Sequence, residues 1–160
     1  MKKITITLKL SELIYDVQNK TYLTGKSRRS GSNHEQVANM QANDDDENAN
    51  QILRSISMAY ATLKTKLSEY MTLMDSSGTN ELLSGEGELS LELQMPSNYN
   101  TSTVDTLVKA AHEYVVSVAI SDWFTITDKA DASDYSKAAE SALAVISEAA
   151  HKRLRPVREA

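Results

Sequence analysis

The chain has 160 residues, no cysteine and a formal net charge of −5 at pH 7, and 41% of its residues are hydrophobic. A chain of this length can bury a single core without a metal or a disulfide. The absence of cysteine excludes disulfide scaffolds, cysteine nucleophiles and thiolate metal sites. No apolar run reaches the roughly 18 residues of a membrane span, and the first residues lack the apolar core of a signal peptide.

The charge is unevenly distributed along the chain. Residues 1–43 carry seven Lys or Arg against three acids, residues 44–150 carry six against eighteen, and the last ten carry four against one. Nucleic-acid binders usually show a basic face across the fold. An acidic body with two basic ends does not predict such a face. Two interpretations of the basic ends stay open: solubility with helix-end complementarity, or docking to an acidic partner or to passing DNA. The basic residues concerned are Lys26, Arg28 and Arg29, and Lys152, Arg153, Arg155 and Arg158.

Alternating apolar residues from Ile4 to Leu10 predict a short N-terminal strand with one buried face. Helical spacing follows and predicts a helix over about 12–24. Ser11 offers a hydroxyl at the expected start of this helix, and Gly25 is the expected stop.

Residues 26–43 are rich in Ser, Asn and Gly and predict a flexible polar loop, with at most one helical turn near Glu35–Met40. The contiguous acids Asp44–Glu47 lack the spaced ligands and glycine of a calcium loop. They are instead typical of an N-cap and acidic first turn. The apolar residues behind them recur at three- and four-residue steps and predict a helix over 45–75, a rod of roughly 45 Å.

After this helix, apolar and polar residues alternate again, and this alternation predicts a β-hairpin insertion over 79–95. The first strand, 79–84, is the weaker one, and Gly85-Glu86-Gly87 is the expected turn. An isolated hairpin is marginal in water, so this one must pack on the body, pair with the N-terminal strand, or add to a neighbour's sheet. Because an exposed apolar strand is a typical subunit contact, the expected interface residues are Leu89, Leu91, Leu93 and Met95.

Two further helices are expected, over about 104–125 and 132–154. The first is apolar around most of its perimeter, which is typical of the buried centre of a bundle. Asp131 or Ser133 is the expected cap of the second helix, and Pro156 follows its end. The fold class is therefore mainly α: a single domain of about four helices with an inserted β-hairpin and a short N-terminal strand.

The motifs of common enzymes are missing from this chain. No two of the three histidines, His34, His112 and His151, have the i, i+4 spacing of a helical metal site. His112-Glu113 begins the zinc motif H-E-x-x-H, but position 116 is valine where the motif requires histidine. Asp122 is the best single candidate for a functional acid, although a helix-edge carboxylate facing solvent or a cation is the favoured interpretation. We expect no catalytic residue, no cofactor and no metal, and hence no enzyme.

The C-terminal half resembles a known family. The pattern is Ala111-x-x-Tyr114-Val115-Val116-x-x-Ala119-x-x-x-Trp123-Phe124, then Asp128-Lys129-x-Asp131-Ala132-x-x-Tyr135, then an alanine-rich helix ending in Arg153-Leu154-Arg155-Pro156. It resembles small helical head–tail connector (adaptor) proteins of tailed bacteriophages, with the closest likeness to phage and prophage chains of Bacteroidales. In those adaptors a β-hairpin lies between a long helix and a C-terminal helix pair, an order that residues 44–158 match.

This resemblance implies a structural protein of the virion, made in the bacterial cytoplasm and placed at the head–tail junction. Copies would form a ring, commonly dodecameric, that binds the portal protein and a tail or second connector protein. The ring would extend the channel through which DNA passes without specific binding, and no membrane is involved. The resemblance implies that the portal protein would be bound by Lys152, Arg153, Arg155 and Arg158. The alternative is a cellular helical protein-binding module of the antitoxin or adaptor kind.

Overall fold

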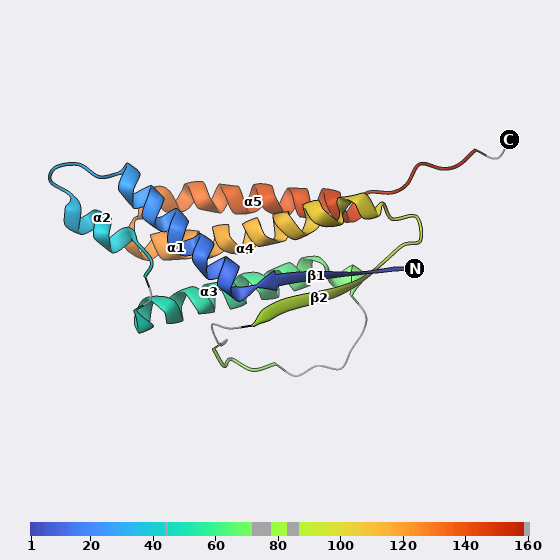
Figure 1. Ribbon diagram of the computed structural model, residues 1–160, viewed down its shortest axis with the longest axis horizontal. Coiled ribbons are helices and arrows are strands. Elements are labelled where there is room, and N and C mark those ends of the chain that lie inside the picture. The colour runs from blue at the N-terminus through green and yellow to red at the C-terminus, as the bar shows by residue number, and fades with distance from the viewer. Residues whose placement is uncertain (44, 72–77, 83–86, 159–160) are drawn as a thin grey trace.

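The computed structural model describes residues 1–43, 45–71, 78–82 and 87–158 (Figure 1). It is mainly helical with a small two-stranded antiparallel sheet, which confirms the predicted fold class. In chain order the elements are β1 (Lys2–Lys9), α1 (Leu10–Ser27), α2 (His34–Met40), α3 (Asp46–Lys66), the 3₁₀ turn η1 (Ser68–Tyr70), β2 (Glu88–Met95), the 3₁₀ turn η2 (Thr101–Thr103), α4 (Val104–Thr127) and α5 (Lys129–His151).

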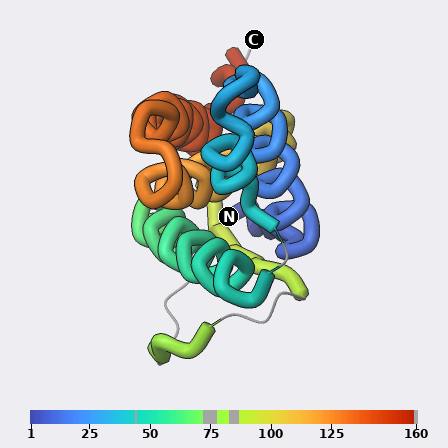
Figure 2. Tube along the Cα trace, turned by 90° about the vertical axis from the view of Figure 1, so that its left-hand side faces the viewer, coloured from blue at the N-terminus to red at the C-terminus, as the bar shows by residue number. Residues whose placement is uncertain are grey.

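Helix α4 is the centre of the molecule, as its apolar perimeter predicts. It packs against α5, α3 and α1 and also contacts β1. Figure 2 shows this arrangement along the bundle, with α1 on one side and α3 and α5 on the other. The α4 residues exposed by 1% or less are Leu107, Ala111, Val115, Val116, Ser117, Ala119, Ile120 and Phe124. Burial on several sides explains why this helix is not amphipathic.

The two strands pair with each other, which decides between the three alternatives left open for the predicted hairpin. β2 runs antiparallel to β1, with Lys9 opposite Glu88 and Lys2 opposite Met95. One face of the sheet enters the core, and the other is polar, with Lys3 Nζ 3.3 Å from Glu92 Oε2. The described part of the weaker predicted strand, residues 79–82, forms no strand, while 83–86 lie outside the described residues. The partner of β2 is thus the distant N-terminal strand.

Helix α1 is longer at both ends than the sequence predicts. It begins directly after β1, with Lys9 as N-cap, so Ser11 lies inside the helix. Gly25 is not a stop but a buried helical residue, and the helix continues to Ser27. A Cβ at position 25 would lie 3.3 Å from the Val37 carbonyl oxygen. This glycine therefore serves close packing of α2 rather than termination.

The predicted polar loop contains α2, where a short helical turn was expected. Val37 and Met40 bury their side chains, and two hydrogen bonds fix the end of this helix. The Trp123 indole donates to the Met40 carbonyl at 2.8 Å, and the Ala42 amide donates to Thr21 Oγ1 at 3.1 Å. Few apolar residues are thus enough to hold the segment on the bundle.

The end of α3 and the start of α5 also differ from the predictions. α3 begins at Asp46 with an acidic first turn as expected, but it ends at Lys66 and is about 31 Å long. The 3₁₀ turn η1 follows it, and 72–75 lie outside the described residues. α5 begins at Lys129, because Asp128 accepts a hydrogen bond from the Ala130 amide at 3.1 Å and caps it. Asp131 and Ser133 are therefore not the cap.

Candidate functional site

The basic segment 152–158 leaves α5 in extended form and projects beyond the bundle (Figure 1). Its first two cations have partners within the chain. Lys152 Nζ lies 3.2 Å from Glu148, and the Arg153 guanidinium donates to two backbone carbonyls at 3.1 and 3.2 Å. Arg155 and Arg158 are exposed and have no ion pair with any described residue. Of the four predicted docking residues, these two are free to meet a partner.

The base of this segment is held rigidly, which explains why α5 ends at His151 and not near 154. The Leu154 amide donates to the Asn98 carbonyl at 2.7 Å, and the Asn100 amide donates to the Lys152 carbonyl at 3.1 Å. Tyr99 between them is fully buried, and its hydroxyl donates to the Ala149 carbonyl at 3.2 Å. The segment therefore leaves the bundle in a defined direction.

The predicted interface residues do not form a surface. Leu89, Leu91, Leu93 and Met95 are only 8%, 1%, 0% and 0% exposed, and all four belong to the core of this chain. The expectation of an exposed apolar strand face is therefore wrong. The physical reason is that β2 pairs with β1, and the joint apolar face covers the helices.

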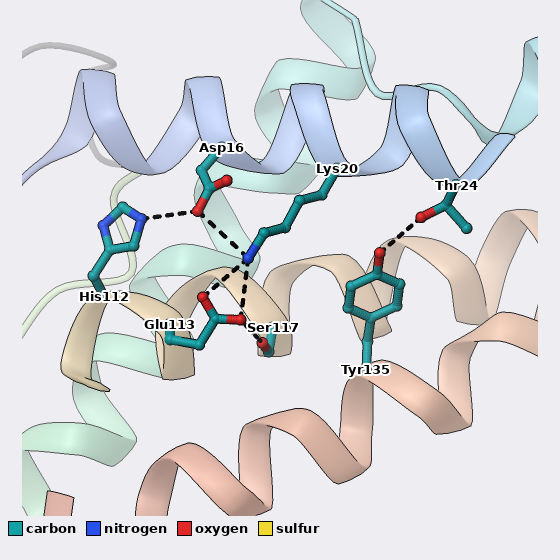
Figure 3. A network of polar contacts seen from close by, with 7 residues as sticks. All are labelled: Asp16, Lys20, Thr24, His112, Glu113, Ser117 and Tyr135. Carbon is teal, nitrogen blue, oxygen red and sulfur yellow. Dashed lines mark hydrogen bonds and ion pairs between the residues drawn. The ribbon is translucent and has the colours of Figure 1, made fainter. Parts of the chain in front are cut away.

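A polar network joins α1 to α4 beside the core (Figure 3). Lys20 Nζ donates to both Glu113 carboxylate oxygens, at 3.0 and 2.9 Å, and lies 3.6 Å from Asp16. Asp16 also contacts His112, whose Nε2 lies 2.9 Å from Asp16 Oδ2. The Ser117 hydroxyl donates to Glu113 at 3.3 Å. Each charged group of the network thus has a partner within it.

The electrostatics of this network favour a structural role. Burial alone would lower the pKa of Lys20, but the hydrogen bond and charge of Glu113 and the charge of Asp16 outweigh it and raise the pKa. An ammonium that keeps its proton is not a nucleophile or a base. A second link lies nearby in Figure 3, where the Thr24 and Tyr135 hydroxyls are 2.7 Å apart and connect α1 to α5.

Arg28, one of the predicted basic-end residues, is engaged inside the chain. Its guanidinium hydrogen-bonds the buried Asp131 carboxylate, with Nε 3.3 Å from Oδ2, and joins α1 to α5. This hydrogen bond lowers the pKa of Asp131, against an opposing effect of burial. The pairing leaves less positive charge at this end of the chain for an external partner.

The remaining titratable candidates lie apart from one another. Asp122 is on an exposed side of α4, where partial burial of the carboxyl raises its pKa while a hydrogen bond from Ser55 opposes the rise. His151 Nδ1 is 2.6 Å from the Ser147 carbonyl oxygen, and His34 begins α2. Within the described ranges, no group of three or more metal-ligating side chains could hold an ion.

Comparison with known proteins adds no assignment: no family model, no curated protein and no solved structure matches this chain. Among the helices of the described residues, none combines the length and the apolar character that crossing a membrane requires.

Proposed function

We propose that this chain is a non-enzymatic structural subunit of a tailed-bacteriophage particle. It forms a ring between portal and tail that extends the DNA channel. The observation that carries the proposal is the rigidly anchored, extended basic segment at the end of an acidic helical bundle. The resemblance of residues 111–156 to head–tail connectors supports the same conclusion.

The basic segment supplies the docking contact. Arg155 and Arg158 are exposed, and a guanidinium recognises carboxylates through two parallel hydrogen bonds. Because the backbone around Tyr99 fixes the base of the segment, less conformational freedom is lost when it binds. An acidic surface on the portal protein is therefore the partner that fits this segment.

The acidic body suits a channel that DNA crosses without being held. Residues 44–150 carry eighteen acids against six Lys or Arg, so their field repels the phosphate backbone. The paired charges of the α1–α4 network support a role without catalysis. Since the β2 leucines are buried, contacts between ring subunits have to come from other surfaces.

Quantitative mass spectrometry of purified virions tests the proposal. We expect this chain at a small fixed ratio to the major capsid protein, as a single ring per particle requires. Absence of the chain from virions in which portal and capsid proteins are detected would refute the proposal. The cellular binding module would then replace it.

A paired substitution tests the docking segment itself. The double variant Arg155→Glu/Arg158→Glu reverses two exposed charges and leaves the anchor intact, so we expect normal melting but no incorporation into particles. Lys137→Glu is the matched control, since it reverses an exposed charge on α5. Equal incorporation of the double variant and the control would contradict the docking role.

A further inference from the structure

The backbone of β1 offers an unused edge. The Leu10 amide donates to the Gly87 carbonyl at 3.1 Å and continues the β1–β2 register by one pair. In an antiparallel pair, hydrogen-bonded positions alternate, so the even positions of β1 face β2. Its odd positions direct their N–H and C=O groups to the opposite edge. These positions are Lys3, Thr5, Thr7 and Lys9, all exposed.

The rest of the chain contacts the outer edge of β2 but leaves most of the outer edge of β1 without hydrogen bonds. On the outer edge of β2, the Tyr60 hydroxyl donates to the Ser90 carbonyl at 2.8 Å, and Met71 forms a bridge with Leu93. On the outer edge of β1, no described residue hydrogen-bonds the backbone of Lys3, Thr5 or Thr7, while the Lys9 carbonyl, at the N-cap of α1, accepts the first hydrogen bond of that helix. The edge of β1 is therefore open to a third strand.

A groove of about 490 Å³ runs beside this edge, where β1 meets the beginnings of α1 and α4. Val108 is the half-buried apolar residue of its wall, Leu8 exposes only 3% of its surface there, and Lys109, His112 and Glu113 form the polar side. β1 contacts α4 as well as β2, and the lining residues from α4 place the groove on the α4 side. A strand added to β1 would thus find an apolar contact at Val108 and polar contacts beside it.

The charges on β1 indicate which kind of strand can pair with its open edge. β1 carries exposed lysines at positions 3 and 9, so a full-length antiparallel pairing with a second copy of β1 would place Lys3 opposite Lys9, which is unfavourable across strands. The chain's own β2 shows the matching chemistry, since Glu92 pairs with Lys3 at 3.3 Å and Glu88 lies opposite Lys9. Apolar residues alternate with these acids.

We propose that the open edge of β1 is a docking site for an extended segment of a partner protein, in which acidic residues alternate with apolar ones. The segment adds to the sheet as a third strand, with main-chain hydrogen bonds to the odd positions of β1 and acids facing the lysines. This inference stands apart from the virion assignment, because peptide binding can succeed or fail whether or not the chain is found in particles.

The probe is a fluorescein-labelled peptide with the sequence of residues 88–95, ELSLELQM, compared by anisotropy with its charge-reversed form KLSLKLQM. We expect the folded chain to bind the acidic peptide and not the basic one. Thr7→Pro removes an outward N–H that the β1–β2 ladder does not use, and proline is tolerated on sheet edges. It should weaken binding by about tenfold or more, while Thr7→Val, which keeps the N–H, should bind as the parent chain does.

A second variant keeps the test valid if Thr7→Pro fails to fold. Lys3→Glu/Lys9→Glu, made together with Glu88→Lys/Glu92→Lys so that the charge pairing with β2 is kept, should exchange the preference, so that the basic peptide binds and the acidic one does not. Equal affinity for both peptides, unchanged binding by Thr7→Pro, or no binding of either peptide would overturn the proposal. Unchanged binding by Thr7→Pro would also indicate that the peptide displaces β2 instead of adding to β1.

Discussion

Replacing Thr21 with valine removes the hydrogen bond that fixes the chain after α2. Thr21 is fully buried, and its hydroxyl accepts from the Ala42 amide at 3.1 Å while donating to the Gln18 carbonyl at 3.0 Å. Valine has the same shape, so no cavity opens. The Ala42 amide, in a residue with 0% exposure, is left buried without an acceptor. Such a group costs about 1–3 kcal/mol, which is the expected loss in the free energy of unfolding.

Urea denaturation measures that loss, and amide hydrogen exchange at Ala42 locates it. Exchange at Ala42 should accelerate in Thr21→Val, because its hydrogen bond is gone. Thr21→Ser is the matched control: it keeps the acceptor and deletes one methyl group, at a cost of about 0.5–1.5 kcal/mol. Protection of Ala42 should survive in the serine variant.

The reasoning is refuted if Thr21→Val unfolds within about 0.5 kcal/mol of the parent chain and exchange at Ala42 is unchanged. The amide would then have another acceptor, and the segment after α2 would not depend on α1 for its position. A loss of protection in Thr21→Ser as large as that in Thr21→Val would contradict the assignment of the hydroxyl as acceptor.

Three further predictions concern packing and charge. Leu91→Asp should lose about 3–5 kcal/mol, because it places a carboxylate in the core, and melting as stable as the parent's by circular dichroism would contradict the burial of this strand. Arg28 lowers the pKa of Asp131, so this pair stabilises the fold above the unfolded pKa of about 3.9 and the effect fades as pH falls below it. Arg28→Gln should therefore lower the melting temperature more at pH 6 than at pH 2.5; an equal loss at both would exclude the ion pair as the cause. A double-mutant cycle on Lys20 and Glu113 at pH 7 should give a coupling of about 0.5–1 kcal/mol for this partly exposed pair, and a coupling of zero would make the network incidental.

The spacing of apolar residues along the chain predicts most of the helices and strands, but it predicts their first and last residues less well. The alternation in Ile4–Leu10 and the perimeter of α4 depend on neighbours in sequence, and both strand and central helix were found. Gly25 was misread as a stop, because its use depends on the approach of Val37 in another helix. The start of α5 shifted for a similar reason, since Asp131 is taken by a cation from α1.

The candidate site was harder to predict, because its partners are distant in the chain. Asp16 and Lys20 show an i, i+4 spacing that marks an ion pair on a helix, but nothing in that spacing points to His112 or Glu113 on α4. The leucines of β2 illustrate the opposite error. Alternation predicts a strand with one apolar face, and only the pairing with β1 shows that the face lies inside the chain.

The pairing of the first strand with a late one has a consequence during synthesis. β1 is complete at Lys9, and its partner is complete only at Met95, 86 residues later. At about 5–20 residues per second, the apolar face of β1 waits roughly 4–17 s for the strand that completes it. Charged residues beside an apolar strand disfavour aggregation, and Lys2, Lys3 and Lys9 lie beside this one during the wait.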